Sequence, residues 1–133
     1  MDLKPASWKN FMDYIISLDE NLGCIVIKVF NAMTSEVSAR SGPEIVRLSE
    51  EKHIKRFLFY VREAPNTQSD VQNYNFATEG ISDFGFPHDS RSAFLVSPDD
   101  TSHDFITTLF LNAGYRVKSF TDEEAAKSWL MKV

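Results

Sequence analysis

The chain has 133 residues, of which 43% are hydrophobic and 25% charged, a balance that excludes a disordered protein and predicts one globular domain over residues 1–133. Its 14 basic and 19 acidic residues give a formal charge of -5 with no basic tail or stripe, which argues against nucleic acid as the main partner. The sequence shows neither a secretory leader nor an apolar run long enough for a membrane span, so we expect a cytoplasmic location.

The N-terminal part of the chain predicts two strands joined by a hairpin. Residues 11–18 carry both a helical and an alternating pattern of apolar residues, and we favour the strand. Residues 19–23 have the composition of a hairpin turn, and they lead into a second strand at residues 25–30. The lone Cys24 excludes an internal disulfide and is expected to be a small buried strand residue.

The middle of the chain predicts alternating helices and strands. A helix is expected to begin near residues 41–44, with Ser41 as its cap and Pro43 in its first position. The β-rich runs 56–61 and 92–96 are bounded by polar or turn residues, as interior strands of a partly parallel sheet are. Helical spacing between these runs predicts a helix with one face formed by Val71, Tyr74, Thr78 and Ile81.

The C-terminal part predicts two more helices around a final strand. Residues 97–100 place a cap and then a proline before an apolar helical face, and Gly114 supplies a left-handed stop. Residues 115–120 predict a strand, and Thr121 with Glu124 predicts a capping box for the last helix. The resulting order, β-β-α-β-α-β-α-β-α, indicates the α/β class with a five-stranded mixed β-sheet and about four flanking helices.

The predicted hairpin, the strand at 57–62, the run 92–96 and the ending 114–130 resemble bacterial SpoIIAA-like proteins. These are relatives of the STAS domain, whose fold is also compared with the CRAL-TRIO lipid carriers. The resemblance extends from about residue 11 onward. It implies a STAS architecture and a non-enzymatic regulatory module that binds a protein partner or a ligand.

The present chain departs from one feature of this family. In anti-sigma-factor antagonists of this class, a serine at the start of the helix after the central strand is phosphorylated, within an Asp-Ser-Ser-Gly type motif. The corresponding segment here offers Thr67 and Ser69 but contains no Ser-Ser-Gly. The motif that carries the family's phosphorylation switch is therefore missing.

The segment 62–70 is the first candidate site, because ligands of open α/β sheets lie beyond the carboxyl ends of the strands. A phosphate on Thr67 or Ser69 would be favoured by a helix N-terminus and by Arg62. The purely structural alternative is that Thr67 or Ser69 caps the next helix, while Arg62 pairs with an acid such as Glu63 or Asp70. The residues predicted here to bind a ligand or partner are Arg62, Thr67, Ser69, Asp70 and Tyr74.

A second candidate is a turn-rich segment containing two aromatic residues. Eight of the eleven phenylalanines lie between Phe57 and Phe110, and most are expected in the core. Phe84 and Phe86, however, flank Gly85 in a loop and have no periodic core role. Three roles stay open for them: the wall of an apolar pocket, a homodimer contact, or a plug folded back on the core.

Catalytic and metal-binding motifs are not found in the sequence. Asp99, Asp100, His103 and Asp104 include metal-ligand types, but acids in the first turn of a helix are stabilised by its dipole alone, so no metal and no cofactor are predicted. Neither a nucleophile elbow nor a glycine-rich phosphate loop is present, so no catalytic residue is assigned.

The leading hypothesis is a non-enzymatic regulatory or binding module that recognises a protein partner or a small apolar ligand. The alternative is a small hydrolase or transferase with a site near Asp99, Asp100 and His103. A purely oligomeric scaffold, such as a homodimer, is a third class.

Overall fold

The computed structural model describes residues 13–132, which form one five-stranded mixed sheet with its strands in chain order. The first two strands pair antiparallel, and each later neighbouring pair is parallel. The predicted α/β class and mixed sheet are therefore confirmed. The strands are β1 (Tyr14–Asp19), β2 (Cys24–Val29), β3 (Arg56–Tyr60), β4 (Arg91–Leu95) and β5 (Arg116–Phe120).

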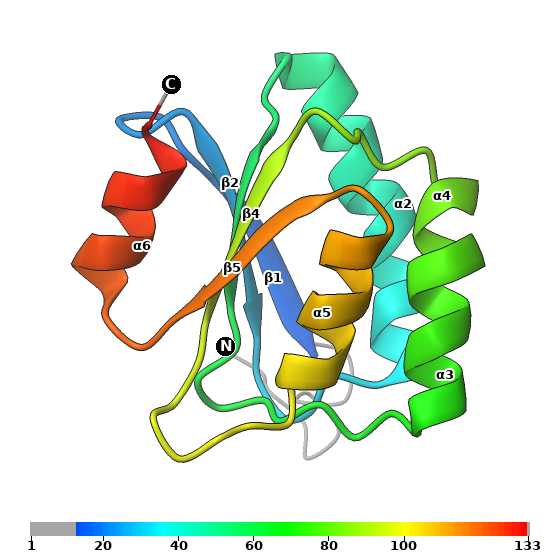
Figure 1. Cartoon of the computed structure of the whole chain (residues 1–133). Helices are drawn as coiled ribbons and strands as arrows, with labels where there is room; N and C mark the ends of the chain where they lie inside the picture. Colours follow the sequence, from blue (N-terminus) through cyan, green and yellow to red (C-terminus); the bar gives the residue numbers. More distant parts are fainter. Residues whose placement is uncertain (1–12, 133) are drawn as a thin grey trace, which may run out of the picture.

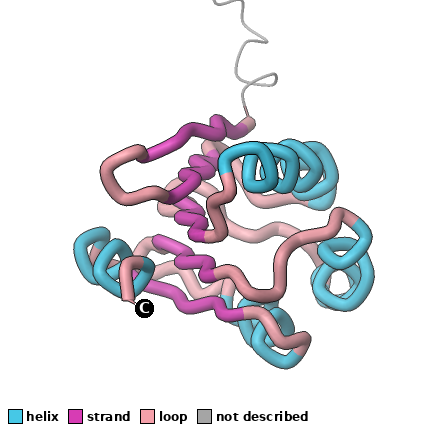
Figure 2. Tube along the Cα trace, turned by 90° about the horizontal axis from the view of Figure 1, so that it is seen from above, coloured by secondary structure: helices cyan, strands magenta, loops and turns pink. Residues whose placement is uncertain are grey.

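Four helical segments in the described part of the chain cover this sheet (Figure 1). The second of them is continuous and runs from α3 through a π-helical turn, η1, into α4. Seen along the sheet in Figure 2, α6 lies on one face and the other three segments lie on the opposite face. The bounds are α2 (Ser35–Lys52), α3 (Asp70–Asn75), η1 (Phe76–Gly80), α4 (Ile81–Asp83), α5 (Asp104–Asn112) and α6 (Glu123–Leu130). Among the described residues, no helix is both long and apolar enough to cross a membrane.

Two apolar clusters hold the layers together, because successive strand residues point to opposite faces of the sheet. The larger cluster lies under the three helical segments and includes Phe57, which is fully buried. The next residue, Leu58, points to the other face and packs with Ala126 and Leu130 of α6. We call the side of the sheet with the larger cluster the three-helix face and the opposite side the α6 face.

The N-terminal hairpin agrees with the predicted turn. Gly23 has a φ of 63°, in the left-handed region that glycine adopts without strain, and its N–H donates to the Asp19 carbonyl at 2.8 Å. The first strand runs from Tyr14, and the part of its predicted range at residues 11–12 lies outside the described residues. Cys24 is buried as predicted, and burial raises the pKa of its thiol to about 11.

The predicted start of the first helix near residues 41–44 is wrong, because α2 begins at Ser35. Thr34 is the actual cap, and its hydroxyl accepts a hydrogen bond from the Val37 N–H at 3.1 Å. Pro43 therefore lies inside the helix, where it removes one backbone donor. Burial of Val37 and Ile45 against the sheet outweighs this local preference.

The second helical segment exists as predicted, but its buried face differs. Val71 is 68% exposed and Tyr74 is 55% exposed, whereas Asn73, Ala77 and Ile81 are buried. These three buried residues are spaced four apart and therefore share one face of the helical segment. Val71 and Tyr74 lie on a different, exposed face of α3.

Two predicted helix starts near the C-terminus are also wrong. The helix expected from Ser97 and Pro98 begins at Asp104, because the intervening residues form turns in which Asp100 N–H donates to the Ser97 carbonyl at 3.0 Å. The last helix is capped by Asp122 in place of Thr121, and Asp122 Oδ2 accepts from the Ala125 N–H at 3.0 Å. Gly114, with a φ of 97°, supplies the predicted left-handed stop.

Candidate functional site

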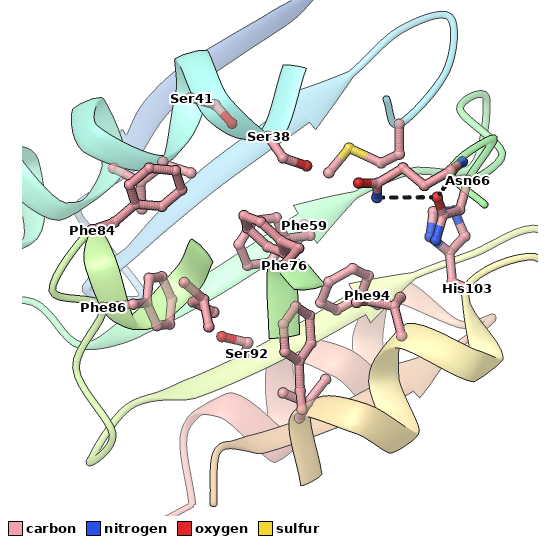
Figure 3. Close-up of a pocket in the computed structure, with 18 residues that line it drawn as sticks. Ser38, Ser41, Phe59, Asn66, Phe76, Phe84, Phe86, Ser92, Phe94 and His103 are labelled. Carbon is pink, nitrogen blue, oxygen red and sulfur yellow. Dashed lines mark hydrogen bonds between the residues drawn. The ribbon is translucent and has the colours of Figure 1, made fainter. Parts of the chain in front are cut away.

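A cavity of about 60 Å³ lies between the three-helix face of the sheet and α2, the α3–α4 segment and α5 (Figure 3). Six phenylalanine rings account for much of its wall: Phe59, Phe76, Phe84, Phe86, Phe94 and Phe110. The polar side chains in the wall are all uncharged or histidine, namely Ser38, Ser41, Asn66, Gln68, Ser92 and His103. None of the residues that line it, within the part of the chain described, is a lysine, arginine, aspartate or glutamate.

One end of the cavity is apolar and is formed by the loop after α4. Figure 3 shows Phe84 and Phe86 at this end. The Phe86 ring lies 4.8 Å from the Phe57 ring, measured between centroids, and the Phe84 ring lies 5.9 Å from that of Phe76. Both predicted inward roles, pocket wall and core plug, describe this geometry, and the homodimer contact stays a prediction.

Gly42 of α2 gives Phe84 the room to reach this position. A Cβ atom added at Gly42 would lie 2.4 Å from the Phe84 ring, which is closer than any real contact of this kind. Glycine is needed here for close approach, since its backbone is helical. Gly42, which the sequence pattern placed at a helix start, therefore lies inside α2 and leaves room for the Phe84 ring.

The other end of the cavity is polar and lies where two loops meet beyond the carboxyl ends of β3 and β4. The Asn66 N–H donates to Ser102 Oγ at 2.8 Å, and His103 Nε2 lies 2.9 Å from the Ala64 carbonyl oxygen. The structure thus joins the candidate segment 62–70 with the segment containing Asp99, Asp100 and His103. Sequence reasoning proposed both segments but did not predict that they are neighbours.

An amide cluster fixes the loop at this polar end. Asn66 Nδ2 donates to Asn73 Oδ1 at 3.0 Å, and Gln68 Nε2 donates to Asn66 Oδ1 at 3.2 Å. Asn73 is only 3% exposed, so its amide is an interior part of the scaffold. Asn66 and Gln68 reach the cavity wall, with their amide groups already engaged.

His103 is the most buried titratable group in the cavity wall, at 1% exposure. Because a carbonyl only accepts hydrogen bonds, Nε2 carries the proton and donates to Ala64. Burial lowers the pKa of the imidazole, although the Ala64 contact and Asp100 oppose this shift. The ring is therefore neutral near pH 7, and Nδ1 is an acceptor that has no partner among the described residues.

Ser38 of α2 is a second buried polar residue in the wall without a partner. Its side chain points into the cavity (Figure 3), and Oγ makes no hydrogen bond to any described residue. Ser41, one turn later, instead donates to the Val37 carbonyl at 2.8 Å. Serine hydroxyls inside helices commonly donate to a backbone carbonyl one turn earlier, as Ser41 does, and the Ser38 hydroxyl does not.

The residues predicted to bind in the segment 62–70 lie outside the cavity wall. Ser69 caps α3 in a complete capping box with Gln72, as the structural alternative predicted. Thr67 Oγ1 donates to the Met33 carbonyl at 3.3 Å, and Asp70 lies in the first turn of α3. Tyr74 projects from α3 and is half exposed.

Arg62 lies on the other side of the sheet from the cavity. Its guanidinium donates to the Thr121 carbonyl at 2.8 Å and lies 5.7 Å from the centre of the Tyr60 ring. The expected ion pair with Glu63 or Asp70 is not among the ion pairs of the described residues. The structure therefore separates Arg62 from Phe84 and Phe86.

The acidic cluster near α5 does not gather into a metal-binding arrangement. Asp100 Oδ2 lies 3.7 Å from His103 Nε2, and Asp100 Oδ1 accepts from the Ser102 N–H at 2.9 Å. In the described part of the chain, no three histidine, cysteine or acidic side chains are placed to hold a metal ion.

Sequence reasoning missed Ser38 and Asn66 as parts of the site. Ser38 and Ser41 share the helical face of Val37 and Ile45, so polar residues within an apolar stripe were a usable signal. That signal was lost because the helix was expected to begin after Ser38. Asn66 gave no signal, since its position depends on the meeting of two loops.

Comparison with protein-family models and with curated proteins finds no match to this chain.

Proposed function

We propose that this protein is a non-enzymatic binding module that holds a small, largely apolar ligand in the cavity. The observation that carries this proposal is a predominantly aromatic wall that also contains buried polar atoms without partners. Protein interiors are normally close-packed, with few voids and few unsatisfied polar groups. Both departures occur here in one place, as expected of a site that a ligand completes.

The size of the cavity limits its occupant. An apolar cavity of about 150 Å³ holds benzene, so the present volume of about 60 Å³ suits a smaller molecule or requires one wall to move. Phe84 is the wall residue best placed to move, because it lies in a loop and is only partly buried. An outward turn of this ring would admit a single aromatic ring.

Toluene binding to the full chain tests this proposal. The ¹⁵N spectrum of the protein should shift at backbone amides around the cavity, and Phe84→Ala should bind toluene more tightly by enlarging the space. Phe105→Ala is the matched control, because Phe105 is 43% exposed and lies outside the wall. If neither toluene nor phenol, which carries a hydroxyl on the same ring, changes the wild type or Phe84→Ala, the cavity is only a packing defect and the proposal fails.

We further infer that the module is STAS-like in fold and regulatory in role. The order of a hairpin followed by alternating helices and parallel strands supports this inference. A ligand under α3 and α5 would change the packing of the loops that flank them, which is a route to altered partner binding. Hydrogen exchange in loops 61–69 and 97–103, with and without toluene, measures that effect.

A protein partner is the second candidate, and the α6 face supports it. The ammonium group of Lys28 lies 5.0 Å from the centre of the Tyr60 ring, and that of Lys118 lies 5.5 Å from Phe120. With Arg62 they place three cations beside aromatic rings on a chain whose formal charge is -5. α6 packs over β3, β4 and β5 and leaves Lys28 exposed. An acidic segment of a partner fits this surface.

A short polyglutamate peptide is the probe for that surface. Binding should weaken as salt rises and should be lost in Lys28→Glu and Arg62→Glu, because exposed charges are screened. Lys52→Glu, at the end of α2, is the control for net charge. Equal loss in all three variants would indicate a non-specific charge effect and would remove this candidate.

The enzymatic alternative near Asp99, Asp100 and His103 is supported less well. The imidazole is buried and donates to a backbone carbonyl, which leaves only Nδ1 for proton transfer. A panel of ester and phosphoester substrates, with and without a chelator, tests it. Turnover that is lost in Asp100→Asn would favour an enzyme over a binding module.

A further inference from the structure

We propose that the cavity selects a neutral molecule with an apolar body and a hydroxyl or N–H group, and that His103 Nδ1 accepts the hydrogen bond from that group. This inference rests on the proposed ligand-binding function and adds the chemical class of the ligand. The class follows from three properties of the wall: an acceptor without a partner, a hydroxyl without a partner, and the absence of charged lining residues.

The acceptor is defined by the tautomer of His103. Nε2 is occupied by its bond to Ala64, and a neutral imidazole with a proton on Nε2 has a lone pair on Nδ1. Burial disfavours the imidazolium form, so Nδ1 does not become a donor near pH 7. The group that satisfies Nδ1 must therefore bring its own hydrogen.

Ser38 provides a second polar position along the same cavity. The backbone N–H of Ser38 already donates to the Thr34 carbonyl at 3.0 Å, so only its side chain is left over. A hydroxyl both donates and accepts, and a larger ligand with a second polar atom would place that atom beside Oγ. Phe59 and Phe76, at the middle of the cavity in Figure 3, bound the apolar body of the ligand.

The uncharged wall excludes ionic ligands. A carboxylate or ammonium group in the cavity would lose its hydration without a described lysine, arginine or acidic side chain in the wall to pair with it. Phosphates and carboxylic acids are therefore poor ligands, whereas alcohols, phenols and indoles match the available acceptor.

Phenol, toluene and benzoate separate these possibilities, because phenol and toluene have the same shape and only phenol carries a donor. Titrations of the full chain, as wild type and as Phe84→Ala, should give phenol a dissociation constant about ten-fold lower than that of toluene, the factor expected for one buried hydrogen bond. Benzoate should not bind. Phe105→Ala should behave as the wild type does.

Two measurements test the role of His103. His103→Met removes the acceptor and should equalise phenol and toluene, while His103→Gln keeps a donor for Ala64 and an acceptor for the ligand and should restore part of the preference. The imidazole ¹⁵N spectrum of the wild type provides a second readout that needs no variant. The Nδ1 resonance should move when phenol is added and stay in place with toluene.

The outcomes distinguish the role of His103 and the neutral class of ligand from the ligand-binding function itself. Equal affinity for phenol and toluene, or an Nδ1 resonance that does not shift when phenol is added, would overturn the role of His103. The cavity would then be a site for purely apolar ligands. Binding of benzoate in preference to phenol would overturn the neutral class. Failure of both phenol and toluene to bind either protein would overturn the ligand-binding function itself.

Discussion

The three-helix face and the α6 face of the sheet are built from alternate residues of the same strands, and they are packed differently. On the α6 face, Leu58, Leu95 and Leu130 are nearly fully buried, and Arg91 closes the edge by donating to the Trp129 carbonyl at 2.8 Å. The three-helix face has more apolar residues and still contains a cavity.

Unsatisfied polar atoms follow the same division. The buried side-chain atoms without a partner in the described residues belong to Ser38, His103, Tyr115 and Ser119, and all four lie on the three-helix side. Such atoms destabilise a fold by the cost of lost hydration. Two of the four, in Ser38 and His103, also line the cavity, so the cavity and half of these unsatisfied atoms occur together.

The largest effect is expected from removing a filled core position. Phe57→Ala should lower the free energy of unfolding by about 3–5 kcal/mol, because Phe57 is fully buried and its loss creates a new cavity. Phe84→Ala should lower it by less than half as much, since this ring borders existing space. Urea denaturation measures both. A larger loss for Phe84 than for Phe57 would show that the cavity wall, and not the sheet, holds this face.

The second effect tests the contact between Gly42 and Phe84. Gly42→Ala should lower the free energy of unfolding by about 1–3 kcal/mol, because the new methyl group overlaps the ring. In the Phe84→Ala background the same change should be neutral or stabilising by up to about 1 kcal/mol, because alanine favours the helix. Additive effects in this double-mutant cycle would contradict the contact.

The third effect is the pH dependence that a buried neutral histidine gives to the three-helix face. Burial places the folded-state pKa of His103 below its unfolded value of 6.5, and Asp100 and Asp104, which favour the imidazolium, do not reverse this. The unfolded state then binds the proton first as pH falls, so stability decreases below about pH 6.5, by at most about 1.4 kcal/mol per pH unit. His103→Gln should flatten this slope between pH 6.5 and 5, as measured by urea denaturation at each pH.

The smallest effect should be the same on both faces. Ser69 caps α3 on the three-helix face, and Asp122 caps α6 on the other, each through a side-chain oxygen that accepts from a backbone N–H. Ser69→Ala and Asp122→Ala should each lower the free energy of unfolding by about 1 kcal/mol. Ser69→Asp should keep the cap. A much larger loss for Ser69 would indicate that it does more than begin a helix.

Short sequence patterns correctly predicted the elements that depend only on residues near one another in the chain. The turn at Gly23, the stop at Gly114 and the strands around Phe57 and Ala93 depend on backbone freedom and on short apolar runs, and the structure has them where they were expected. Helix starts were predicted less well, because Ser41, Ser97 and Thr121 all have the chemistry of a cap. Only the packing of the following turn decides which of two nearby candidates is used.

The candidate site was predicted only in its parts. Phe84, Phe86, His103 and the loop around Asn66 were each notable in the sequence, but nothing local indicated that they surround one space. Arg62 and Tyr74 were also predicted to bind, and neither lines the cavity. Arg62 contacts Thr121 and Tyr60 beyond the end of β3, and Tyr74 is on the exposed side of α3.

The sequence by itself determined the α/β class, the mixed sheet and most of its strands, since these follow from periodicity and turn chemistry within a few residues. The tertiary structure alone decided where α2, α5 and α6 begin, which residues of the second helical segment are buried, and that a neutral histidine and a serine share a cavity with phenylalanine rings. These features depend on contacts between segments far apart in the chain, and such contacts leave no periodic signal in the sequence.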